Sequence, residues 1–194
     1  RVADPGDRGP KSVIELQRFD ANSDSTAGRV SVEAQIVEQY LQLVYRWRSW
    51  AEPLILSTRA ASPQRRDELW RNTCAEMFVA FDSEVHSNSS YLEFNFSPSG
   101  DWAAYHFDAT RKGMRPHTWS GAAVPLVSSS GSPEDFALQA LVPLEAMGRG
   151  FYRVAYASVV ETEHGLSYWA LKHPSDRPDF HHPESFAASL EFPS

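Results

Sequence analysis

An alternation of apolar and polar residues across positions 91–108 constrains the fold of this chain more than any other feature. Tyr91–Phe96 and Trp102–Phe107 both have strand-like patterns, and the Ser-Pro-Ser-Gly sequence between them is typical of a tight hairpin turn. Because successive side chains of a strand point to opposite faces, Glu93 and Asn95 share one face and three apolar residues share the other. The pattern predicts a sheet with one core face and one face able to bind a ligand.

Similar alternation recurs along the chain and predicts further strands. Residues 30–36 and 41–47 alternate in opposite phase, which indicates a turn or β-bulge near Glu38 and Gln39. A helical spacing also fits positions 37–47, but we favour two strands there. Other expected strands cover residues 69–81, 136–142, 154–163, 166–172 and 186–192. These segments, with no long amphipathic helix, predict an all-β fold: an antiparallel two-sheet β-sandwich of immunoglobulin-like or jelly-roll type with minor helical turns.

Residues 154–163 and 166–172 are expected to form a hairpin around a His-Gly loop, because glycine tolerates the positive φ of such a turn. The register that follows pairs Val160 with Trp169. This pairing places Trp169 in an ordinary sheet core.

The 194 residues fit a single domain. Residues 1–29 are rich in Asp, Gly, Ser, Arg and Pro, so we expect a flexible N-terminal tail followed by one ligand-binding β-sandwich domain over residues 30–194. No apolar run approaches the roughly 20 residues of a membrane helix, so membrane insertion is not expected. The compartment stays open between cytoplasm and periplasm, and the oligomeric state is not predicted.

Composition narrows the class of partner. The chain has 18 Lys and Arg against 25 Asp and Glu, a net charge of −7 that disfavours nucleic acid. Its single cysteine, Cys74, excludes an internal disulfide and a cysteine-based zinc site. The aromatic content of 12% suits strands and also suits stacking on sugar rings. The expected partner is therefore a small polar ligand, and a sugar is the favoured candidate.

Four blocks of the sequence resemble the bacterial DOMON-like proteins that are grouped with family 9 carbohydrate-binding modules. They are LWRNTCAEMF (69–78), YLEFNFSPSGDW (91–102), YHFDATRKGM (105–114) and YWALKHPSDRPDFHHPESF (168–186). With the linking strands, the resemblance covers residues 30–192. It implies a two-sheet β-sandwich whose better-known relatives bind sugars or b-type haem.

Glu76, Glu93 and Asn95 are the first candidate ligand-binding residues, since they lie on two strands expected to be neighbours. Carboxylates and amides bind sugar hydroxyls through paired hydrogen bonds. The same residues could instead face solvent or complete a buried structural network. The two glutamates could also act as acid and base in glycoside hydrolysis, which needs carboxyl groups roughly 5–10 Å apart.

Aromatic side chains could stack on the apolar face of a sugar ring. We expect most of them to be core residues and favour Trp102 and Trp119 as stacking platforms. The other aromatic candidates are Trp70, Tyr105, Tyr168 and Trp169. Arg111 could bind a carboxylate or sugar oxygens with its planar guanidinium group.

The proline-rich segment near the C-terminus contributes His173, Asp179 and His181, which we expect to form one wall of the ligand pocket. Imidazoles and a carboxylate this close in sequence could alternatively ligate a metal. In a third interpretation the loop folds back, and Asp179 and His181 bond backbone groups.

Three functions follow from these residues. The favoured one is a non-catalytic, carbohydrate-binding domain without a cofactor. The second is a b-type haem domain for electron transfer, with His106 and Met114 as the nominated ligands. The third is an enzyme that uses the Glu76 and Glu93 carboxyl groups or a His/Asp metal site, and we lean against it.

Overall fold

The computed structural model describes residues 13–19, 28–81 and 84–192. Its strands are β1 (Ile14–Arg18), β2 (Arg29–Val37), β3 (Tyr40–Arg48), β4 (Cys74–Ala80), β5 (Tyr91–Phe96), β6 (Trp102–Phe107), β7 (Arg115–Pro116), β8 (Leu126–Ser132), β9 (Asp135–Pro143), β10 (Gly150–Thr162), β11 (Gly165–Ala170) and β12 (Ala188–Phe192). The 3-10 helices are η1 (Leu69–Arg71), η2 (Leu144–Ala146) and η3 (Pro183–Ser185). No helix among these residues is long and apolar enough to cross a membrane.

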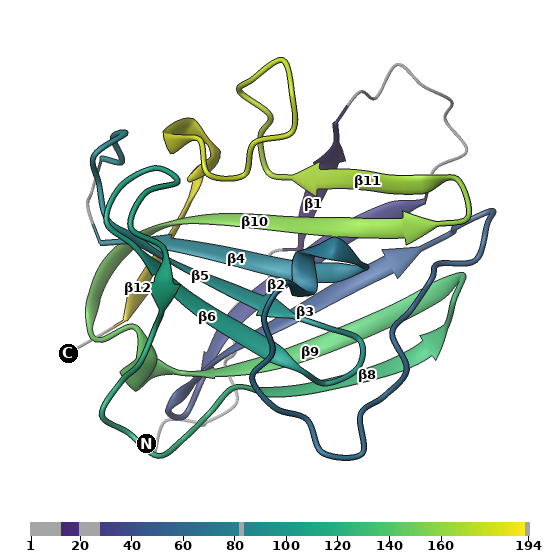
Figure 1. Ribbon diagram of the computed structural model, residues 1–194, viewed down its shortest axis with the longest axis horizontal. Coiled ribbons are helices and arrows are strands. Elements are labelled where there is room, and N and C mark those ends of the chain that lie inside the picture. Colours follow the sequence, from purple (N-terminus) through teal and green to yellow (C-terminus); the bar gives the residue numbers. More distant parts are fainter. Residues whose placement is uncertain (1–12, 20–27, 82–83, 193–194) are drawn as a thin grey trace, which may run out of the picture.

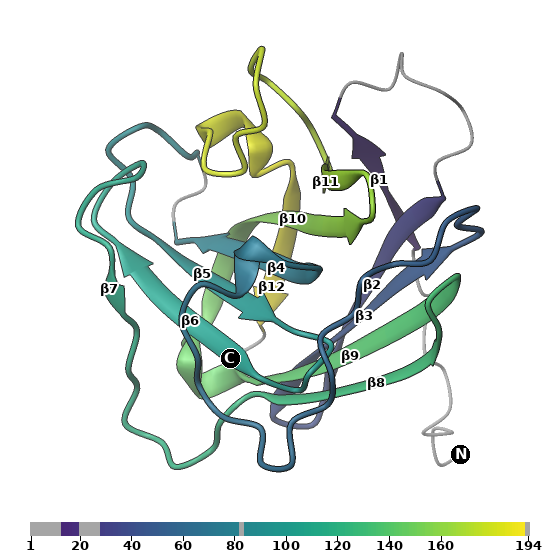
Figure 2. The same ribbon diagram turned by 45° about the vertical axis from the view of Figure 1, so that its right-hand side comes forward.

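The strands form one strongly curled antiparallel sheet whose two halves pack face to face (Figures 1 and 2). The first half has the order β1-β2-β3-β9-β8, and the second has the order β7-β6-β5-β4-β10-β11, with β12 also beside β10. Strand β1 pairs with β2 on one edge and with β11 on the other, so it joins the halves. The all-β, antiparallel β-sandwich predicted from the sequence is confirmed.

Most local strand predictions agree with the structure, although η1 occupies the start of the expected strand 69–81 and β8 was not predicted. The turn between β2 and β3 falls at Glu38 and Gln39, where Glu38 has a φ of 54°. The β5–β6 hairpin has the predicted bounds, and Gly100 in its turn has a φ of 95°. A Cβ atom at Gly100 would lie 2.9 Å from the Pro63 ring, so both conformation and space require glycine there.

The β10–β11 hairpin forms, but its predicted register is wrong. Val160 pairs with Ser167, and Trp169 pairs with Ser158. The loop consists of residues 163–164, and Gly165 begins the next strand with a φ of 111°. The register therefore differs by two residues, which leaves every side chain on its predicted face.

The predicted N-terminal tail needs a correction. Residues Ile14–Arg18 form β1, and Arg29 begins β2, so these parts of the 1–29 region belong to the sheet. Strand β1 pairs with β2 on one side and with β11 on the other. The polar residues around this short strand hide its strand pattern in the sequence. The rest of the predicted tail, residues 1–12 and 20–27, lies outside the described residues.

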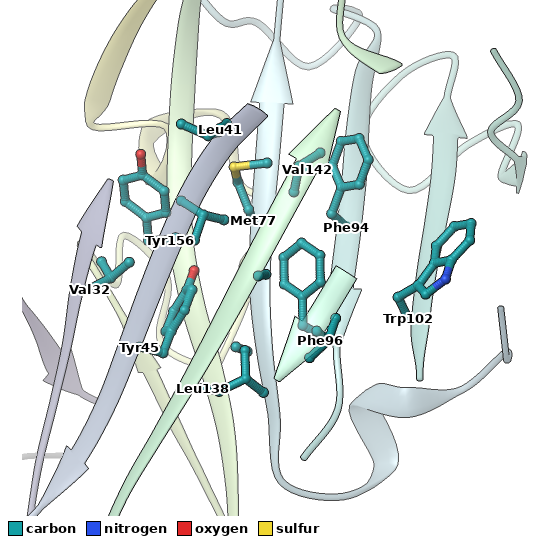
Figure 3. Packing of buried hydrophobic residues seen from close by; sticks show 14 of the residues in the cluster. Val32, Leu41, Tyr45, Met77, Phe94, Phe96, Trp102, Leu138, Val142 and Tyr156 are labelled. Atoms are coloured by element: carbon teal, nitrogen blue, oxygen red, sulfur yellow. The ribbon is translucent and has the colours of Figure 1, made fainter. Parts of the chain in front are cut away.

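The main core fills the space between the two halves (Figure 3). Two buried hydrogen bonds also cross this space. The Tyr45 hydroxyl of β3 donates to the Glu76 backbone carbonyl of β4 at 2.6 Å, and the Trp47 indole N–H donates to the Ser158 hydroxyl of β10 at 3.0 Å. These bonds fix how the first half sits on β4, the strand that carries Glu76.

Replacing Tyr45 with phenylalanine should lower the free energy of unfolding by about 1–2 kcal/mol, because it removes one buried hydrogen bond without opening a large cavity. For a chain of this size, that corresponds to a fall of roughly 2–8 °C in melting temperature. Tyr40→Phe is the matched control, since the Tyr40 hydroxyl makes no hydrogen bond within the described residues. Equal melting temperatures for the two variants would contradict the assigned role of Tyr45.

Candidate functional site

The second half of the sheet is covered on its outer face as well as its inner face. Residues 171–187, which we call the covering segment, pack over β10, β4 and β5. They form the yellow-green and yellow stretch between β11 and β12 in Figures 1 and 2. Phe180 and Phe186 of this segment contact Phe78 of β4, with ring centroids 6.4 Å apart in each case. All residues of β4 and β5 are consequently buried.

A cavity of about 800 Å³ remains between this outer face and the surrounding loops. Its lining combines acidic, aromatic, basic and aliphatic side chains. They are Trp70, Arg71, Glu76, Glu93, Phe107, Arg111, Met114, Val159, Leu166, Tyr168, Arg177, Pro178, Phe180 and His181. A cavity of this size and mixed lining suits a small polar ligand.

Strand pairing places two carboxyl groups side by side in the lining. Glu76 pairs with Asn95, and Phe78 pairs with Glu93, so Glu76 and Glu93 are diagonal neighbours on the same face. They are 3% and 4% exposed, respectively. We call Glu76 and Glu93 the carboxyl pair. Its geometry agrees with the alternation in the sequence.

The two members of the pair differ in their hydrogen bonds. The Asn95 side-chain amide donates to Glu93 Oε1 at 2.7 Å from a fully buried position behind the lining. Glu76 Oε1 is buried and has no hydrogen-bond partner among the described residues. A buried polar atom without a partner is costly, so a ligand group that reached Glu76 Oε1 would supply a missing hydrogen bond.

Burial also changes the protonation of the pair. It raises the pKa of Glu76 well above its usual value, and the nearby Glu93 raises it further. Burial raises the pKa of Glu93 to about 7, against the opposing effects of the Asn95 hydrogen bond and the Arg111 charge. At neutral pH the pair therefore retains at least one proton and can both donate and accept hydrogen bonds.

His181 extends the polar network on the side of Glu93. Its Nδ1 lies 2.8 Å from the Tyr91 hydroxyl, which also accepts the backbone N–H of Arg111 at 3.2 Å. We assign the Tyr91 proton to the bond with Nδ1, which leaves His181 Nε2 protonated and 3.8 Å from Glu93 Oε2. Burial, aided by the Arg111 charge, lowers the pKa of His181 to about 4, so the imidazole is neutral at neutral pH.

An ion pair joins two loops at the rim of the cavity. Arg111, in the loop after β6, donates to Asp179 Oδ1 from Nη2 at 2.8 Å and from Nε at 3.2 Å. The same oxygen accepts the backbone N–H of His181 at 3.1 Å. Arg111 has a φ of 57°, a left-handed conformation uncommon for this residue type. The covering segment is thereby attached to the β6–β7 loop.

Six of the nine predicted ligand-binding residues gather at this cavity. Glu76, Glu93, Arg111 and His181 line it, Asn95 supports Glu93 from behind, and Asp179 holds Arg111 at the rim. The backbone contact of Asp179 agrees with the third interpretation of this loop. The ligand-binding role of these residues stays a prediction.

The other three predicted residues lie elsewhere. Trp102 pairs with Phe96, is 8% exposed, and packs in the core between the halves. Trp119 packs against it with ring centroids 6.0 Å apart. His173 bonds the Gln17 carbonyl through Nε2 at 2.8 Å. None of the three lines the cavity, so the proposed stacking surface must come from other residues.

The residues nominated for haem do not fit one haem site. Alternation along β6 puts Phe107 on the cavity face and His106 on the opposite face, towards the core between the halves. Met114 lines the cavity. Because the sheet lies between them, His106 and Met114 cannot be axial ligands of one haem.

The predicted His/Asp metal site is not assembled either. His173 and His181 are engaged with Gln17 and Tyr91, respectively, and Asp179 is engaged with Arg111. Within the part of the chain that the structure describes, the ligand atoms close enough to share an ion belong to Glu52, Glu163 and His164 at the β10–β11 loop.

The aromatic lining was missed as a site by sequence reasoning, although two of its members were among the aromatic candidates. Trp70 follows Leu69 in η1, immediately before β4, and Tyr168 pairs with Val159 on β10. That Tyr168 lies on the same face of the sheet as Glu76 follows only once Ala157 of β10 is known to pair with Glu76. That pairing joins residues about 80 positions apart, which periodicity does not reveal.

Comparison of the sequence with protein-family models and with curated proteins finds no match. Solved structures are similar in fold. A candidate carbohydrate-binding protein from Bacteroides uniformis gives a TM-score of 0.69 at 16% identity, over 94% of this chain and 87% of that chain. A family 9 carbohydrate-binding module from Caldicellulosiruptor kristjanssonii, in complex with cellotriose, gives 0.57 at 8% identity, over 93% and 82%. At these identities the likeness establishes the β-sandwich fold alone.

The raised pKa of Glu93 should make stability depend on pH. Since the folded-state pKa of about 7 exceeds the usual 4.5, folding takes up a proton between these values, and stability falls as pH rises from about 4.5 to above 7. Glu93→Gln keeps the acceptor for Asn95 and removes this dependence. We expect the variant to be more stable than the parent at pH 8, by at most about 3 kcal/mol, with the difference vanishing near pH 4.

Thermal melting from pH 4 to pH 8 checks this expectation. Glu191→Gln, on the exposed surface of β12, is the matched control and should follow the parent protein at every pH. A Glu93→Gln variant whose stability stays parallel to that of the parent would show that Glu93 is ionised in the folded protein.

Proposed function

We propose that this protein is a carbohydrate-binding domain and that the cavity above β4 and β5 holds the sugar. The observation that carries the proposal is the carboxyl pair, buried in a cavity of about 800 Å³ whose other walls are aromatic and basic. Sugars present hydroxyl groups around an edge and C–H groups on each face, so they need polar and aromatic partners at once.

The lining offers a partner for each part of a sugar ring. Trp70 and Tyr168 provide aromatic surface, while the carboxyl pair offers hydrogen-bond donors and acceptors at the sheet. Arg111, fixed by Asp179, presents N–H groups at the rim. These residues replace Trp102 and Trp119 as the proposed stacking surface.

The structural neighbours support the same function at a coarser level. One is described as a candidate carbohydrate-binding protein and another as a family 9 module holding cellotriose. We further propose that the chain is a DOMON-like protein related to that family. This finer assignment rests on the sequence blocks given above.

Replacing Trp70 with alanine should weaken sugar binding at least tenfold, because it removes aromatic area from the ring face, a loss of about 1.4 kcal/mol or more. Isothermal titration calorimetry with cello-, xylo- and chito-oligosaccharides measures the effect. Trp119→Ala is the matched control: it removes an indole outside the cavity and should leave affinity unchanged in the folded fraction. Absence of binding to every sugar at millimolar concentration, or equal losses in both variants, would refute the proposal.

Glycoside hydrolysis is a second candidate, favoured by the proximity of two buried carboxyl groups with raised pKa values. A working enzyme should release reducing sugar from a bound oligosaccharide, and Glu76→Gln or Glu93→Gln should each reduce the rate at least about 100-fold. Chromatography of prolonged incubations gives the measurement. If the protein binds an oligosaccharide and the oligosaccharide stays intact during incubation, glycoside hydrolysis is refuted and non-catalytic binding remains.

A further inference from the structure

The carboxyl pair has no positively charged partner. Glu76 Oε1 makes no hydrogen bond in the described part of the chain, and the group nearest to an ion pair with Glu93 is the neutral His181, 3.8 Å away. Two of the three arginines in the lining are engaged at the rim, Arg111 with Asp179 and Arg71 with Glu68 at 2.9 Å. The third, Arg177, is exposed and forms no ion pair with Glu76 or Glu93 among the described residues. Neither acid at the base of the cavity therefore forms an ion pair with a cation of the lining, and the charge of Arg111 acts on Glu93 without direct contact.

The groups around the pair come from every neighbouring strand. On β4 and β5 they include Cys74, whose pKa burial raises well above its usual value, and Tyr91, whose pKa burial raises to about 12. Strand β10 contributes the apolar Ala157 and Val159, and β6 places Tyr105, whose pKa burial also raises, opposite Glu93. At neutral pH these neighbours are uncharged, so an ionised carboxyl group here would be stabilised most by a cation supplied with a ligand.

The rest of the cavity also suits a cation. Four aromatic side chains contribute to its lining: Trp70, Phe107, Tyr168 and Phe180. Aromatic faces attract ammonium groups, and the attraction is strongest where water is excluded. A primary ammonium has three N–H donors, which matches an arrangement of several carboxyl oxygens better than a single hydroxyl does.

We propose that the cavity prefers an amino sugar, with the ammonium group of the ligand held between Glu76 and Glu93. This inference rests on the proposed carbohydrate-binding function and names the sugar class. Glu76 Oε1 accepts one ammonium N–H, and Glu93, positioned by Asn95, accepts another. Trp70 and Tyr168 cover the sugar ring.

Proton release gives this arrangement its own signature. The pair retains at least one proton in the empty cavity at neutral pH, and an incoming ammonium stabilises the ionised form, so binding expels a proton to solvent. An N-acetylated sugar of the same length brings no charge and leaves the pair protonated. The two ligands therefore differ in both affinity and proton release.

Calorimetry with glucosamine oligosaccharides and their fully N-acetylated counterparts tests the proposal. At pH 6, where the ligand amines are mostly protonated in solution, the amino form should bind at least tenfold more tightly. Titration in two buffers that differ in ionisation enthalpy should report net proton release for the amino form and none for the acetylated form. Tighter binding without proton release, or equal affinities, would overturn the inference.

Variants separate the carboxyl pair from the general attraction of an acidic protein for cations. Glu76→Gln and Glu93→Gln should each reduce the preference for the amino form over the acetylated form to about threefold or less, whatever the change in affinity for the acetylated form. Glu191→Gln removes one surface charge and should keep the full preference. A preference that survives both cavity variants would overturn the inference.

The proposed function and the inference can fail separately. If neutral oligosaccharides bind and the amino form gains nothing, the carbohydrate-binding function stands and the amino-sugar preference falls. If neither form binds, and thermal melting shows a folded protein, both are refuted for these sugars.

Discussion

Burial of both faces of β4 and β5 is the constraint on which the rest of this structure depends. An antiparallel sandwich ordinarily leaves the outer face of each sheet in water. Here the covering segment packs over that face and removes it from solvent. Glu76 and Glu93 are consequently buried, although their alternation with apolar residues is the pattern of an ordinary two-faced strand. The electrostatics of the cavity follow from this cover.

The cover itself is held by a few specific contacts. Phe180 and Phe186 contribute apolar packing on Phe78, and the Arg111–Asp179 ion pair ties the segment to the β6–β7 loop. The ion pair is partly exposed, so it contributes modestly to stability and acts mainly by fixing geometry. Apolar packing provides the stabilisation, and the polar contacts set the shape of the opening.

Local structure could be predicted from the sequence because it depends on neighbouring residues. The β5–β6 hairpin and the shared face of Glu93 and Asn95 follow from alternation and one glycine turn. The same reasoning could have placed Trp102 in the core, since a hairpin with these bounds pairs it with the apolar Phe96. A position just after a turn therefore does not by itself bring a tryptophan to a ligand-binding face.

Long-range pairing could not be predicted in the same way. Strand β4 pairs with β10, and β10 pairs with β11, so Tyr168 lies on the same face of the sheet as Glu76. No local sequence pattern indicates this pairing. Strand β1 could not be predicted because its five residues lie in a polar region of the sequence. Its strand conformation depends on pairing with the distant strands β2 and β11. The covering segment has no periodicity, so contacts with distant residues determine its path.

The curled sheet has two free ends, β7 and β8, and these strands are consecutive in the chain. Residues 117–125 therefore bridge the side of the sandwich opposite β1. His117 Nε2 lies 2.7 Å from the Ala146 carbonyl, and Trp119 packs on Trp102 along this bridge. Strand β1 joins the two halves on one side of the molecule, and residues 117–125 connect them on the other. The two halves can therefore separate on that second side only if residues 117–125 lose their packing contacts.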